Sequence, residues 1–385
     1  MIRIDDRSQC CGCSACQAVC PHGAITMKPD RLGFMYPEVD QDLCVDCGLC
    51  ENVCSFKPQG SFVKPAAYAV RHKDDREVAG STSGAVFVAL SDHILEKGGA
   101  VYGAAFDEGF RVVHKKAVTS DARDEMRKSK YVQSDMGDVF RQVRKDLKDG
   151  MTVLFSGTPC QTAGLRSYIG PMLSQNLYLV DIVCHGVPSP KVWEAYLAWQ
   201  EKKHGSEVLK VDFRDKTYGW RSHKEAFVFP DGKVTDTSYT YLFYEHLTLR
   251  ESCGNCHFAS LGRPSDLTLA DYWRKDKAVP DFASDGKGCS LILCSSVKGR
   301  ELLSAVDDCL HVSETVLADC IQPNMKAPSR LHPKREAFER DFAERGLEYV
   351  MRRYGDLGWR YAVRASCKRV YQSVRQTARK ILGRR

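Results

Sequence analysis

The sequence predicts a mixed α+β and α/β fold, in which a small cysteine-rich module precedes a larger sheet domain and a helical tail. Nine of the 18 cysteines fall within the first 54 residues, and eight of them form two copies of one spacing. From residue 66 onward, apolar strand-like stretches alternate with helical ones, as in a mixed or parallel sheet covered by helices. Beyond Lys334 the pattern is helical. The expected parts are residues 1–58 for the module, 66–145 and 150–325 for two parts of the sheet domain, and 334–385 for a basic helical tail.

The N-terminal cysteines predict two 4Fe-4S clusters. Each quartet has the spacing C-x2-C-x2-C-x3-C, which is the spacing of bacterial two-cluster ferredoxins, where the fourth cysteine binds the other cluster. The expected ligand sets are therefore crossed. They are Cys10, Cys13, Cys16 and Cys54 for the first cluster, and Cys44, Cys47, Cys50 and Cys20 for the second. Zinc sites and disulfide frameworks also use C-x2-C pairs, but neither explains two complete quartets.

Two positions near these cysteines depart from the simplest form of the pattern. Pro21 follows the first quartet, whereas Ser55 follows the second, where a proline is expected. This change alters the local turn but removes no ligand. Cys11 is a ninth cysteine inside the first loop, and we interpret it as a spare buried thiol.

The bulk composition is that of a globular protein larger than a simple ferredoxin. A chain of 385 residues suggests two or three domains, and its apolar fraction of 43% and charged fraction of 27% are ordinary for a soluble protein. No apolar run is long enough to span a membrane, and the charged residues after Met1 leave no room for a signal peptide. Because metal-binding thiolates need a reducing compartment, we expect a cytoplasmic protein.

The end of the chain predicts a basic amphipathic helix. Residues 359–385 contain nine Lys or Arg and no acid, against a net charge of +7 for the whole chain. Apolar residues recur there at spacings of three and four, from Val363 to Ile381. Docking onto the protein itself and peripheral contact with an anionic membrane are equally good interpretations. Nucleic-acid binding is disfavoured because no base-reading motif is present.

The sheet domain contains several recognisable elements. Strands are predicted at residues 67–70, 101–106, 112–118, 152–155 and 177–183, with the second and third forming a hairpin. Helices are predicted over residues 161–168 and from Pro190 to about Lys203, and residues 208–240 read as an antiparallel excursion. Cys160 and Cys184 both follow predicted strands, where sheets of this class carry functional groups.

Four cysteines of the sheet domain have the ligand number of a third cluster. Cys253 and Cys256 form a C-x2-C pair, and Cys160 and Cys184 complete the set. By spacing alone, a structural zinc site and unliganded buried thiols are open alternatives. Four more cysteines lie nearby in the sequence, at Cys289, Cys294, Cys309 and Cys320.

Several motifs of this domain resemble the family of coenzyme F-420 hydrogenase/dehydrogenase beta subunits over approximately residues 66 to 325. They are Gly157-Thr158-Pro159-Cys160-Gln161, Cys184-His185-Gly186-Val187-Pro188-Ser189, Cys253 with Cys256, and Leu267 to Trp273. The resemblance implies a flavoprotein that binds FAD on a mixed-sheet domain, and a third 4Fe-4S cluster at Cys160, Cys184, Cys253 and Cys256. The Cys-His-Gly context is more like the bacterial branch, whose members occur among polysaccharide-synthesis genes.

Two segments supply the candidate flavin-binding residues. The first is Ser81, Thr82, Ser83 and Gly84, and the second is Ser129, Lys130, Tyr131, Gln133 and Ser134. The first segment offers hydroxyls and backbone N–H groups at the start of a predicted helix, which suits a phosphate, with the Lys130 ammonium as its charge partner. A plain helix cap and an ordinary polar loop are the alternative interpretations.

His185 is the candidate catalytic residue. Its imidazole follows a candidate cluster ligand and titrates near neutrality, so it is suited to exchange a proton with a substrate. A structural histidine is the alternative. The residues expected to hold an anionic substrate nearby are Arg214, Lys216, Trp220, Arg221, Asp271 and Trp273.

These features predict an iron-sulfur flavoprotein oxidoreductase that passes electrons between 4Fe-4S clusters and FAD, to reduce or oxidise an organic small molecule or a deazaflavin-type cofactor. Flavin joins one-electron to two-electron chemistry. The alternative is a non-catalytic electron-transfer subunit that links ferredoxin to a partner oxidoreductase, in a polysaccharide-synthesis pathway for example. A third interpretation is a zinc-stabilised binding module with an appended ferredoxin. The expected partners are ferredoxin or another redox donor, a small-molecule substrate and a partner oxidoreductase.

Overall fold

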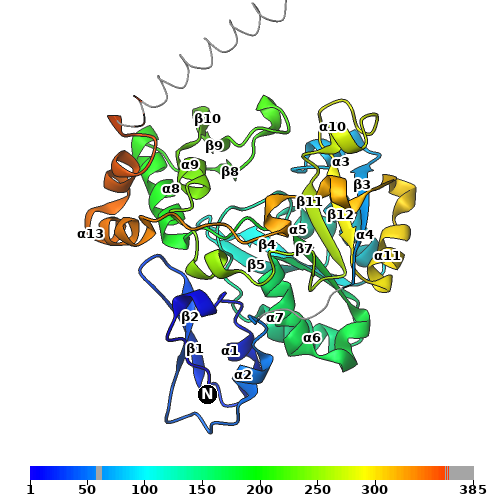
Figure 1. Cartoon of the computed structure of the whole chain (residues 1–385), viewed down its shortest axis with the longest axis horizontal. Coiled ribbons are helices and arrows are strands. Elements are labelled where there is room, and N and C mark those ends of the chain that lie inside the picture. Colours follow the sequence, from blue (N-terminus) through cyan, green and yellow to red (C-terminus); the bar gives the residue numbers. More distant parts are fainter. Residues whose placement is uncertain (58–62, 360, 362, 364–385) are drawn as a thin grey trace, which may run out of the picture.

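The computed structural model describes residues 1–57, 63–359, 361 and 363 (Figure 1). Its strands form one sheet of eight, one of three and one hairpin of two. Most of the predicted basic amphipathic helix, at residues 364–385, lies outside the described residues. In the described part of the chain, no helix combines the length and the apolar character that crossing a membrane requires.

The N-terminal module consists of one hairpin and two short helices. Strands β1 (Ile25–Pro29) and β2 (Met35–Val39) pair antiparallel, and helices α1 (Ala15–Val19) and α2 (Leu49–Val53) each follow one cysteine loop. A 3-10 turn, η1 (Arg7–Gln9), precedes the first loop. Both helices start from a left-handed residue, with φ of 64° at Ser14 and 74° at Gly48. These turns change the direction of the chain between each cysteine loop and the helix that follows it.

The large sheet has the strand order β13-β3-β12-β11-β7-β6-β4-β5. Its strands are β3 (Ala66–His72), β4 (Ala100–Phe106), β5 (Val112–Ala117), β6 (Val153–Gly157), β7 (Leu177–Ile182), β11 (Leu267–Asp271), β12 (Ser290–Cys294) and β13 (Leu310–Thr315). The pairs β4–β6, β6–β7 and β7–β11 are parallel and the other four are antiparallel. The predicted mixed sheet is confirmed, and so is the predicted hairpin, in which Val101 of β4 lies opposite Ala117 of β5.

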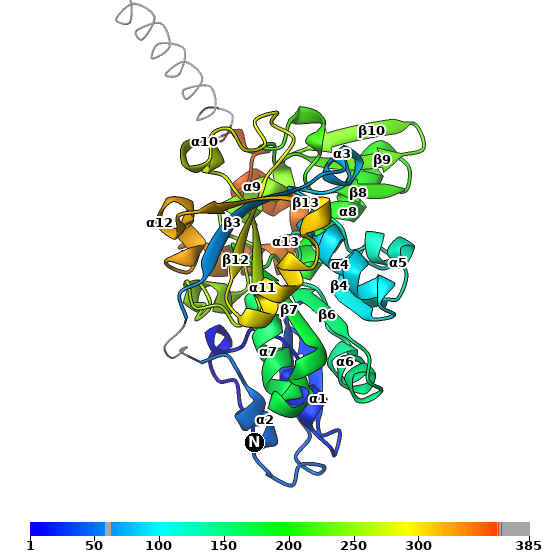
Figure 2. The same cartoon turned by 90° about the vertical axis from the view of Figure 1, so that its right-hand side faces the viewer.

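Helices cover this sheet and continue beyond it (Figure 2). They are α3 (Asp75–Ala79), α4 (Val86–Glu96), α5 (Ser120–Asp124), α6 (Val139–Lys148), α7 (Pro159–Ile169), α8 (Pro190–His204), α9 (Ser238–Tyr244), α10 (Lys275–Ala278), α11 (Val297–Ser304), α12 (Leu317–Cys320) and α13 (Arg335–Arg353). The shorter 3-10 turns are η2 (Pro171–Asn176), η3 (Lys216–Tyr218), η4 (Glu251–Asn255), η5 (Asp307–Cys309) and η6 (Pro323–Met325). Helix α13 contains a kink at Gly346, where φ is 75°.

Strand β6 and helix α7 form the unit that positions the site. Val153, Leu154 and Phe155 of β6 are all fully buried, as expected for a central strand covered on both faces. Proline at the first position of α7 suits a helix start, and the side chain of Gln161 accepts a hydrogen bond from the Thr158 backbone N–H at 2.9 Å. Cys160 is therefore held on the first turn of α7, at the carboxyl end of β6.

A small antiparallel sheet carries the predicted excursion. Strands β8 (Lys210–Asp212), β9 (Glu225–Phe229) and β10 (Gly232–Asp236) pair in the order β10-β9-β8. Their apolar side packs with α8, α9 and α13 around Trp193, Phe213 and Tyr239. The antiparallel expectation for residues 208–240 is thus confirmed.

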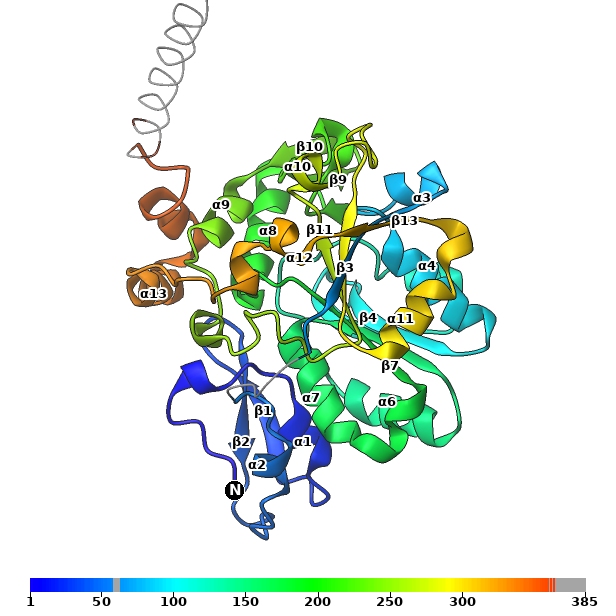
Figure 3. The ribbon, with the colours of Figure 1, turned by 45° about the vertical axis from the view of Figure 1, so that its right-hand side comes forward.

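The N-terminal module lies beside helix α7 and the loop that contains η4 (Figure 3). Helices α1 and α2 both contact α7, and η1 contacts η4. Because α7 carries Cys160 and η4 carries Cys253, the module faces the region in which the remaining candidate ligands lie.

Candidate functional site

The second cysteine set, Cys20, Cys44, Cys47 and Cys50, lines one cavity in the N-terminal module. The cavity has an empty volume of about 370 Å³, part of it open to solvent. Cys47 is exposed, whereas Cys50 is buried. The cavity draws one cysteine from the first loop and three from the second, which is the crossed grouping that the spacing predicts.

The first cysteine set, Cys10, Cys13, Cys16 and Cys54, gathers on the side of the module that faces the large domain. The pKa of Cys16 is raised mainly by burial and further by the charges of Cys13, Cys10 and Cys54, so these thiols lie near one another. The pKa of Cys54 is likewise raised by burial and by Cys13. This grouping also crosses the two loops.

The third cysteine set, Cys160, Cys184, Cys253 and Cys256, lines a second cavity between the module and the large domain. Its empty volume is about 500 Å³, part of it open to solvent. Cys160 comes from α7, Cys184 follows β7, and Cys253 and Cys256 lie in η4 and at its end. Three separate segments therefore bring four thiols to one space, whose donor chemistry fits a 4Fe-4S cluster.

Hydrogen bonds to sulfur hold three of these side chains in place. The backbone N–H of Val187 donates to Sγ of Cys253 at 3.3 Å, and that of Gly186 donates to Sγ of Cys184 at 3.4 Å. The hydroxyl oxygen of Thr158 lies 3.2 Å from Sγ of Cys160. Donors aimed at sulfur are one of the ways in which proteins stabilise cluster thiolates.

Burial opposes ionisation of most of these thiols. It raises the pKa of Cys253 to about 12 and that of Cys256 to about 11, and it raises the pKa of Cys184 as well. The pKa of Cys160 is instead lowered to about 7, first through its hydrogen bond with Cys11. Iron bound at this site would hold all four side chains as thiolates.

A single metal ion needs a tighter arrangement of ligands than a cluster does. Across the described ranges, no three His, Cys, Asp or Glu side chains lie close enough together to hold one ion, and this holds for both N-terminal cysteine sets too. In a cubane each cysteine binds a different iron atom, so its sulfurs lie farther apart than around one ion.

Cys11 lies between the first and third cysteine sets. Its side chain is only 5% exposed and lines the cavity of the third set. Its thiol is within hydrogen-bonding reach of both Cys13 and Cys160. Cys11 is buried, as expected, and it also contacts Cys13 of the first set and Cys160 of the third set directly. We call the contact of Cys11 with Cys13 and Cys160 the junction.

Two residues predicted to bind flavin lie at the junction. The Gln133 side-chain amide donates to the backbone carbonyl of Cys11 at 2.9 Å. The Ser134 hydroxyl oxygen accepts a hydrogen bond from the side chain of Gln161 at 2.9 Å. Both residues are about nine-tenths buried. Gln133 thus binds the N-terminal module, and Ser134 binds α7.

The other predicted flavin segments meet near the start of α4. The backbone N–H of Ser129 donates to the Thr82 hydroxyl oxygen at 3.3 Å, which joins the two segments. The ammonium of Lys216 lies 3.5 Å from the carbonyl oxygen of Ser83, to which it donates. A Cβ atom on Gly84 would lie 2.4 Å from the backbone oxygen of Val70, so only glycine fits there.

Other groups of this loop are tied to neighbouring elements. The Ser83 hydroxyl donates to the carbonyl of Cys289 at 2.7 Å, and the Gly84 N–H donates to the hydroxyl of Ser290 at 2.9 Å. These bonds fasten the loop to β12. Ala85, with φ of 62°, then leads into α4, so the helix begins later than the sequence pattern predicts.

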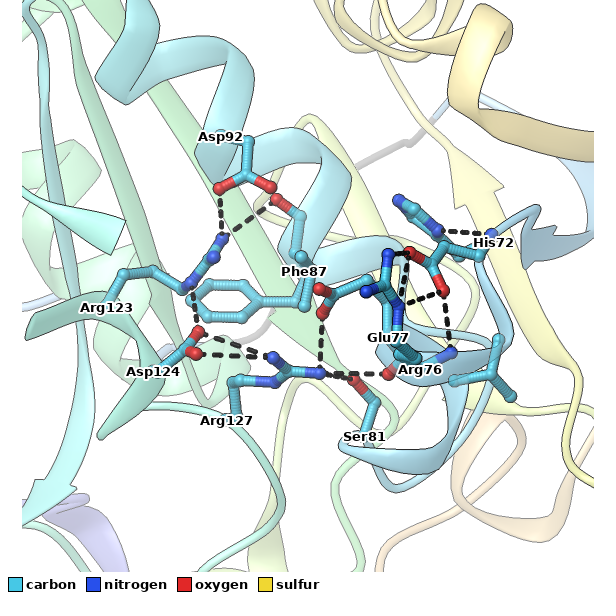
Figure 4. A network of polar contacts seen from close by, with 12 residues as sticks. His72, Arg76, Glu77, Ser81, Phe87, Asp92, Arg123, Asp124 and Arg127 are labelled. Carbon is cyan, nitrogen blue, oxygen red and sulfur yellow. Dashed lines mark hydrogen bonds and ion pairs between the residues drawn. The ribbon is translucent and has the colours of Figure 1, made fainter. Parts of the chain in front are cut away.

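Arginine side chains support the outer side of the same loop (Figure 4). Arg127 donates to the Ser81 hydroxyl oxygen at 3.2 Å and pairs with Glu77 at 2.8 Å. Arg123 pairs with Asp92 and Asp124, both at 2.8 Å. The network fixes Ser81 against α3 and α5.

Lys130 is bound by backbone oxygens. Its ammonium donates to the carbonyls of Glu125 and Arg127, both at 2.8 Å, and to that of Lys128 at 3.5 Å. Burial lowers the pKa of Lys130 to about 7. The ammonium of Lys216 is also bound by backbone oxygens, since it donates to the carbonyls of Val78 at 2.6 Å, Lys287 at 3.0 Å and Ser83 at 3.5 Å, and the last of these contacts brings it to the loop of Ser83.

His185 is part of an aromatic cluster close to the third cysteine set. Its Nε2 atom lies 2.7 Å from Nε2 of His246, and its Nδ1 atom lies 3.1 Å from the side-chain oxygen of Asn324. Burial, together with the charge of His246, lowers the pKa of His185. The two imidazoles share a proton position, so His185 can exchange a proton with His246.

The aromatic cluster links His185 to Tyr131. Phe243 lies edge-on to His185 at 5.2 Å and stacks on Tyr131 at 5.2 Å, measured between ring centroids. Tyr244 contacts both His185 and His223. Sequence motifs do not reveal Phe243, Tyr244 or His246, because ordinary aromatic residues in and after a helix carry no sequence signature of a site.

The predicted substrate residues largely come together beside this cluster. Arg214 pairs with Asp271 at 2.5 Å, and the Trp220 indole N–H donates to the same carboxylate at 3.0 Å. Trp273 stacks on Trp220 with centroids 5.2 Å apart. Arg221 instead lies at the surface, paired with Asp276 at 2.8 Å. Arg214 and Asp271 thus form the polar centre of this region.

Comparison with known proteins identifies two modules. Residues 9–57 match the family described as 4Fe-4S dicluster domain. Residues 150–316 match the family described as the C terminus of the coenzyme F420 hydrogenase/dehydrogenase beta subunit. These matches confirm the predicted combination of a two-cluster module with a domain of that family.

Two individual proteins are also similar to this chain. A subunit of the F(420)H(2) dehydrogenase from Methanosarcina mazei is 22% identical over 223 residues, which cover 54% of this chain and 60% of the relative. The chain thus spans less than two thirds of that relative. A solved structure of the F420-reducing NiFe hydrogenase complex from Methanosarcina barkeri gives a TM-score of 0.47 at 15% identity, over 78% of this chain and 97% of that chain.

Proposed function

A 4Fe-4S dicluster domain at residues 9–57 and the C-terminal domain of coenzyme F420 hydrogenase/dehydrogenase beta subunits at residues 150–316 make up most of this chain, and from them we propose a ferredoxin-linked iron-sulfur flavoprotein oxidoreductase. It passes electrons between three 4Fe-4S clusters and FAD, to reduce or oxidise an organic small molecule. The cysteine-rich composition supports a reducing compartment, the cytoplasm.

The observation that carries this proposal is the junction. Cys11 is buried between Cys13 of the first cysteine set and Cys160 of the third. Two cluster sites in such contact are suited to exchange electrons, whereas two unrelated metal sites need no common boundary. The four thiols of the third set would hold the cluster that receives electrons from the module.

The flavin site is proposed where Thr82, Ser83 and Ser129 meet Lys216. Lys216 supplies positive charge there, and its pKa, lowered to about 8 by burial, leaves it mostly protonated at neutral pH. Flavin supplies the exchange between single electrons and a hydride. From this loop, Arg214, Tyr131 and Phe243 lead to His185 beside the third set, which is where a substrate would exchange its proton.

The test is a stopped-flow reduction of the anaerobic full chain by a one-electron donor, which follows the order in time in which the centres are reduced. We expect the cluster absorbance to bleach first and the flavin absorbance to follow in the same molecule. Chains in which the clusters are reduced while bound flavin stays oxidised would contradict the proposed order. A protein that contains zinc and no flavin would instead support the zinc-stabilised binding module.

The second candidate function is electron transfer to a partner oxidoreductase, with this chain as a relay. The surface around the second cysteine set favours an outside redox partner, because Cys47 is exposed and Leu43, Val45 and Leu49 are 50%, 61% and 42% exposed around it. Residues 33–56 also contain five acids and no Lys or Arg. The name of the M. mazei relative, one of the subunits of a dehydrogenase, agrees with this alternative.

Turnover separates the two functions. An autonomous enzyme converts substrate when the purified chain is supplied with a reduced ferredoxin alone. A relay protein converts none until a co-purifying oxidoreductase is added back. Activity of the isolated chain at the rate of the mixture would exclude the relay interpretation.

A further inference from the structure

Arg250 is a fully buried cation at the boundary between the N-terminal module and the large domain. Its side chain has 0% relative exposure. Among the ion pairs of the residues that the structure describes, no carboxylate partners Arg250. Other buried arginines do have one, since Arg263 pairs with Asp181 at 2.8 Å and Arg335 pairs with Glu251 at 3.3 Å. A buried charge without a counter-charge is strongly unfavourable, so its compensation must come from elsewhere.

The guanidinium of Arg250 is bound instead by the first cysteine loop. It donates to the carbonyl oxygen of Cys10 at 2.8 Å, to that of Met35 at 2.9 Å and to the side-chain oxygen of Gln133 at 3.0 Å. One further N–H points at Sγ of Cys10, with nitrogen and sulfur 3.7 Å apart. The contacts extend from the large domain into the module and include a ligand of the first cluster.

The surroundings of this side chain are shaped to admit it. A Cβ atom on Gly12 would lie 2.7 Å from Nη1 of Arg250, and Gly12 has φ of 69°, which only glycine adopts readily. The ring of Tyr36 lies beneath the guanidinium, with its centroid 4.1 Å away. The module therefore leaves space for the Arg250 side chain at Gly12 and packs Tyr36 against its guanidinium.

Arg250 also reaches the third cysteine set. It lines the cavity of that set and stands three residues before Cys253, at the start of η4. Its charge acts on Cys160 and Cys253 of the third set as well as on Cys10 and Cys13 of the first. One cation is thus shared by two groups of four cysteines.

We propose that Arg250 is a positioning and tuning residue that holds the first cluster against the third and raises the reduction potential of both. A 4Fe-4S cluster with four thiolates is anionic and becomes more so on reduction, so a nearby positive charge and an N–H donor to sulfur favour the reduced state. Low polarity around the buried guanidinium strengthens that effect. The clusters in turn supply the negative charge that Arg250 lacks from carboxylates.

The experiment is a redox titration of the anaerobic full-length protein, followed by electron paramagnetic resonance. In Arg250→Gln we expect the reduction potentials of the first and third clusters to fall together, because the charge is removed. The second cluster serves as an internal reference, since no residue of its cavity contacts Arg250. Arg335→Gln is the matched control, as it removes a neighbouring buried arginine that has carboxylate partners, and it should leave all potentials unchanged.

Arg250→Lys separates tuning from simple packing. Lysine keeps the charge but loses the fork that makes several of the hydrogen bonds. We expect Arg250→Lys to keep the potential of the first cluster close to that of the wild type, whether or not Arg250→Gln retains its iron. Equal behaviour of the two variants, either both normal in potential or both without clusters, would overturn the inference.

This inference rests on the proposed function only for the third cluster. If the wild-type protein holds just two clusters, the proposed third cluster is wrong, and the potential of the first cluster still tests the role of Arg250. If all three clusters are present and the first keeps its potential in iron-replete Arg250→Gln, the role of Arg250 is wrong and the proposed function stands.

Discussion

A Cβ atom on Gly164 would lie 2.8 Å from Sγ of Cys13, so helix α7 packs against the first cysteine set without room for a side chain at this position. Gly164 stands one turn after Cys160 on α7. The glycine therefore fixes the distance between Cys13 of the first cysteine set and Cys160 of the third. Helix α7 therefore contacts the first cysteine set through Gly164 and carries Cys160 of the third set.

Gly164→Ala should weaken this packing. The Cys13 sulfur cannot move aside once it binds iron, so the added methyl group pushes the module away from α7, at a cost of about 1–3 kcal/mol. Denaturant unfolding, followed by cluster absorbance, measures the loss. Gly109→Ala is the control, because a Cβ there meets only a carboxylate oxygen at 3.8 Å. Equal stability of the two variants would show that the close approach is not required.

Cysteine substitutions should separate ligands from the junction thiol. Cys160→Ala removes a ligand of the third set, so iron should fall from about twelve to about eight atoms per chain, with labile sulfide falling in proportion. Cys11→Ala removes a thiol that belongs to none of the three sets, and iron should stay at its wild-type level. Iron and sulfide analysis of both proteins provides the measurement. A loss of iron in Cys11→Ala alone would make Cys11 the ligand.

Flavin retention should depend on Lys216. Its ammonium lies against the loop of Ser83, where the flavin phosphate is proposed, and replacing it with an apolar side chain removes that charge. We expect Lys216→Met to reduce extractable flavin several-fold, with iron content unchanged. Lys210→Met is the control, because Lys210 is an exposed lysine of neighbouring β8. Full flavin content in Lys216→Met would place the phosphate elsewhere.

Glu225 should make the protein less stable as pH rises. Burial raises the pKa of Glu225 to about 8 from an ordinary value of 4.5. Between these two pH values the unfolded chain releases the proton and the folded chain keeps it, so the folded state loses stability as pH increases through this range. Below about pH 4.5 the penalty is absent, and above about pH 8 it is complete.

Glu225→Gln removes that titration while keeping the shape of the side chain. The melting temperature of the wild type should therefore fall more steeply than that of Glu225→Gln between pH 5 and 8, as followed by circular dichroism. Parallel pH profiles for the two proteins would contradict burial of Glu225 as a neutral acid.

Local patterns predict some parts of this protein and leave others undetermined. Spacing alone predicts the crossed N-terminal sets, because three cysteines separated by two residues each surround one cluster, whereas the fourth, after three intervening residues, binds the other cluster. Short apolar stretches likewise predict β4 and β5 as a hairpin, and alternation of polar and apolar residues predicts the strands of the excursion. Such patterns depend only on neighbouring residues, which is why they suffice.

Contacts between distant segments are beyond those patterns. Spacing leaves the grouping of Cys160 with Cys253 open, and only the family resemblance implies it, because η4 meets α7 through the tertiary fold. Arg250 stands in no motif, and its role depends on how the module packs against the large domain. For the same reason Gln133 is predicted as a flavin residue, whereas its side chain binds the Cys11 backbone.

The composition of the wild-type protein tests the central claim most directly. The chain should be purified without oxygen and analysed for iron, acid-labile sulfide, zinc and extractable flavin in the same sample. The three-cluster flavoprotein account predicts about twelve irons and about one FAD per chain. About eight irons without flavin, after reconstitution with iron, sulfide and FAD, would contradict it and confine the redox chemistry to the N-terminal module.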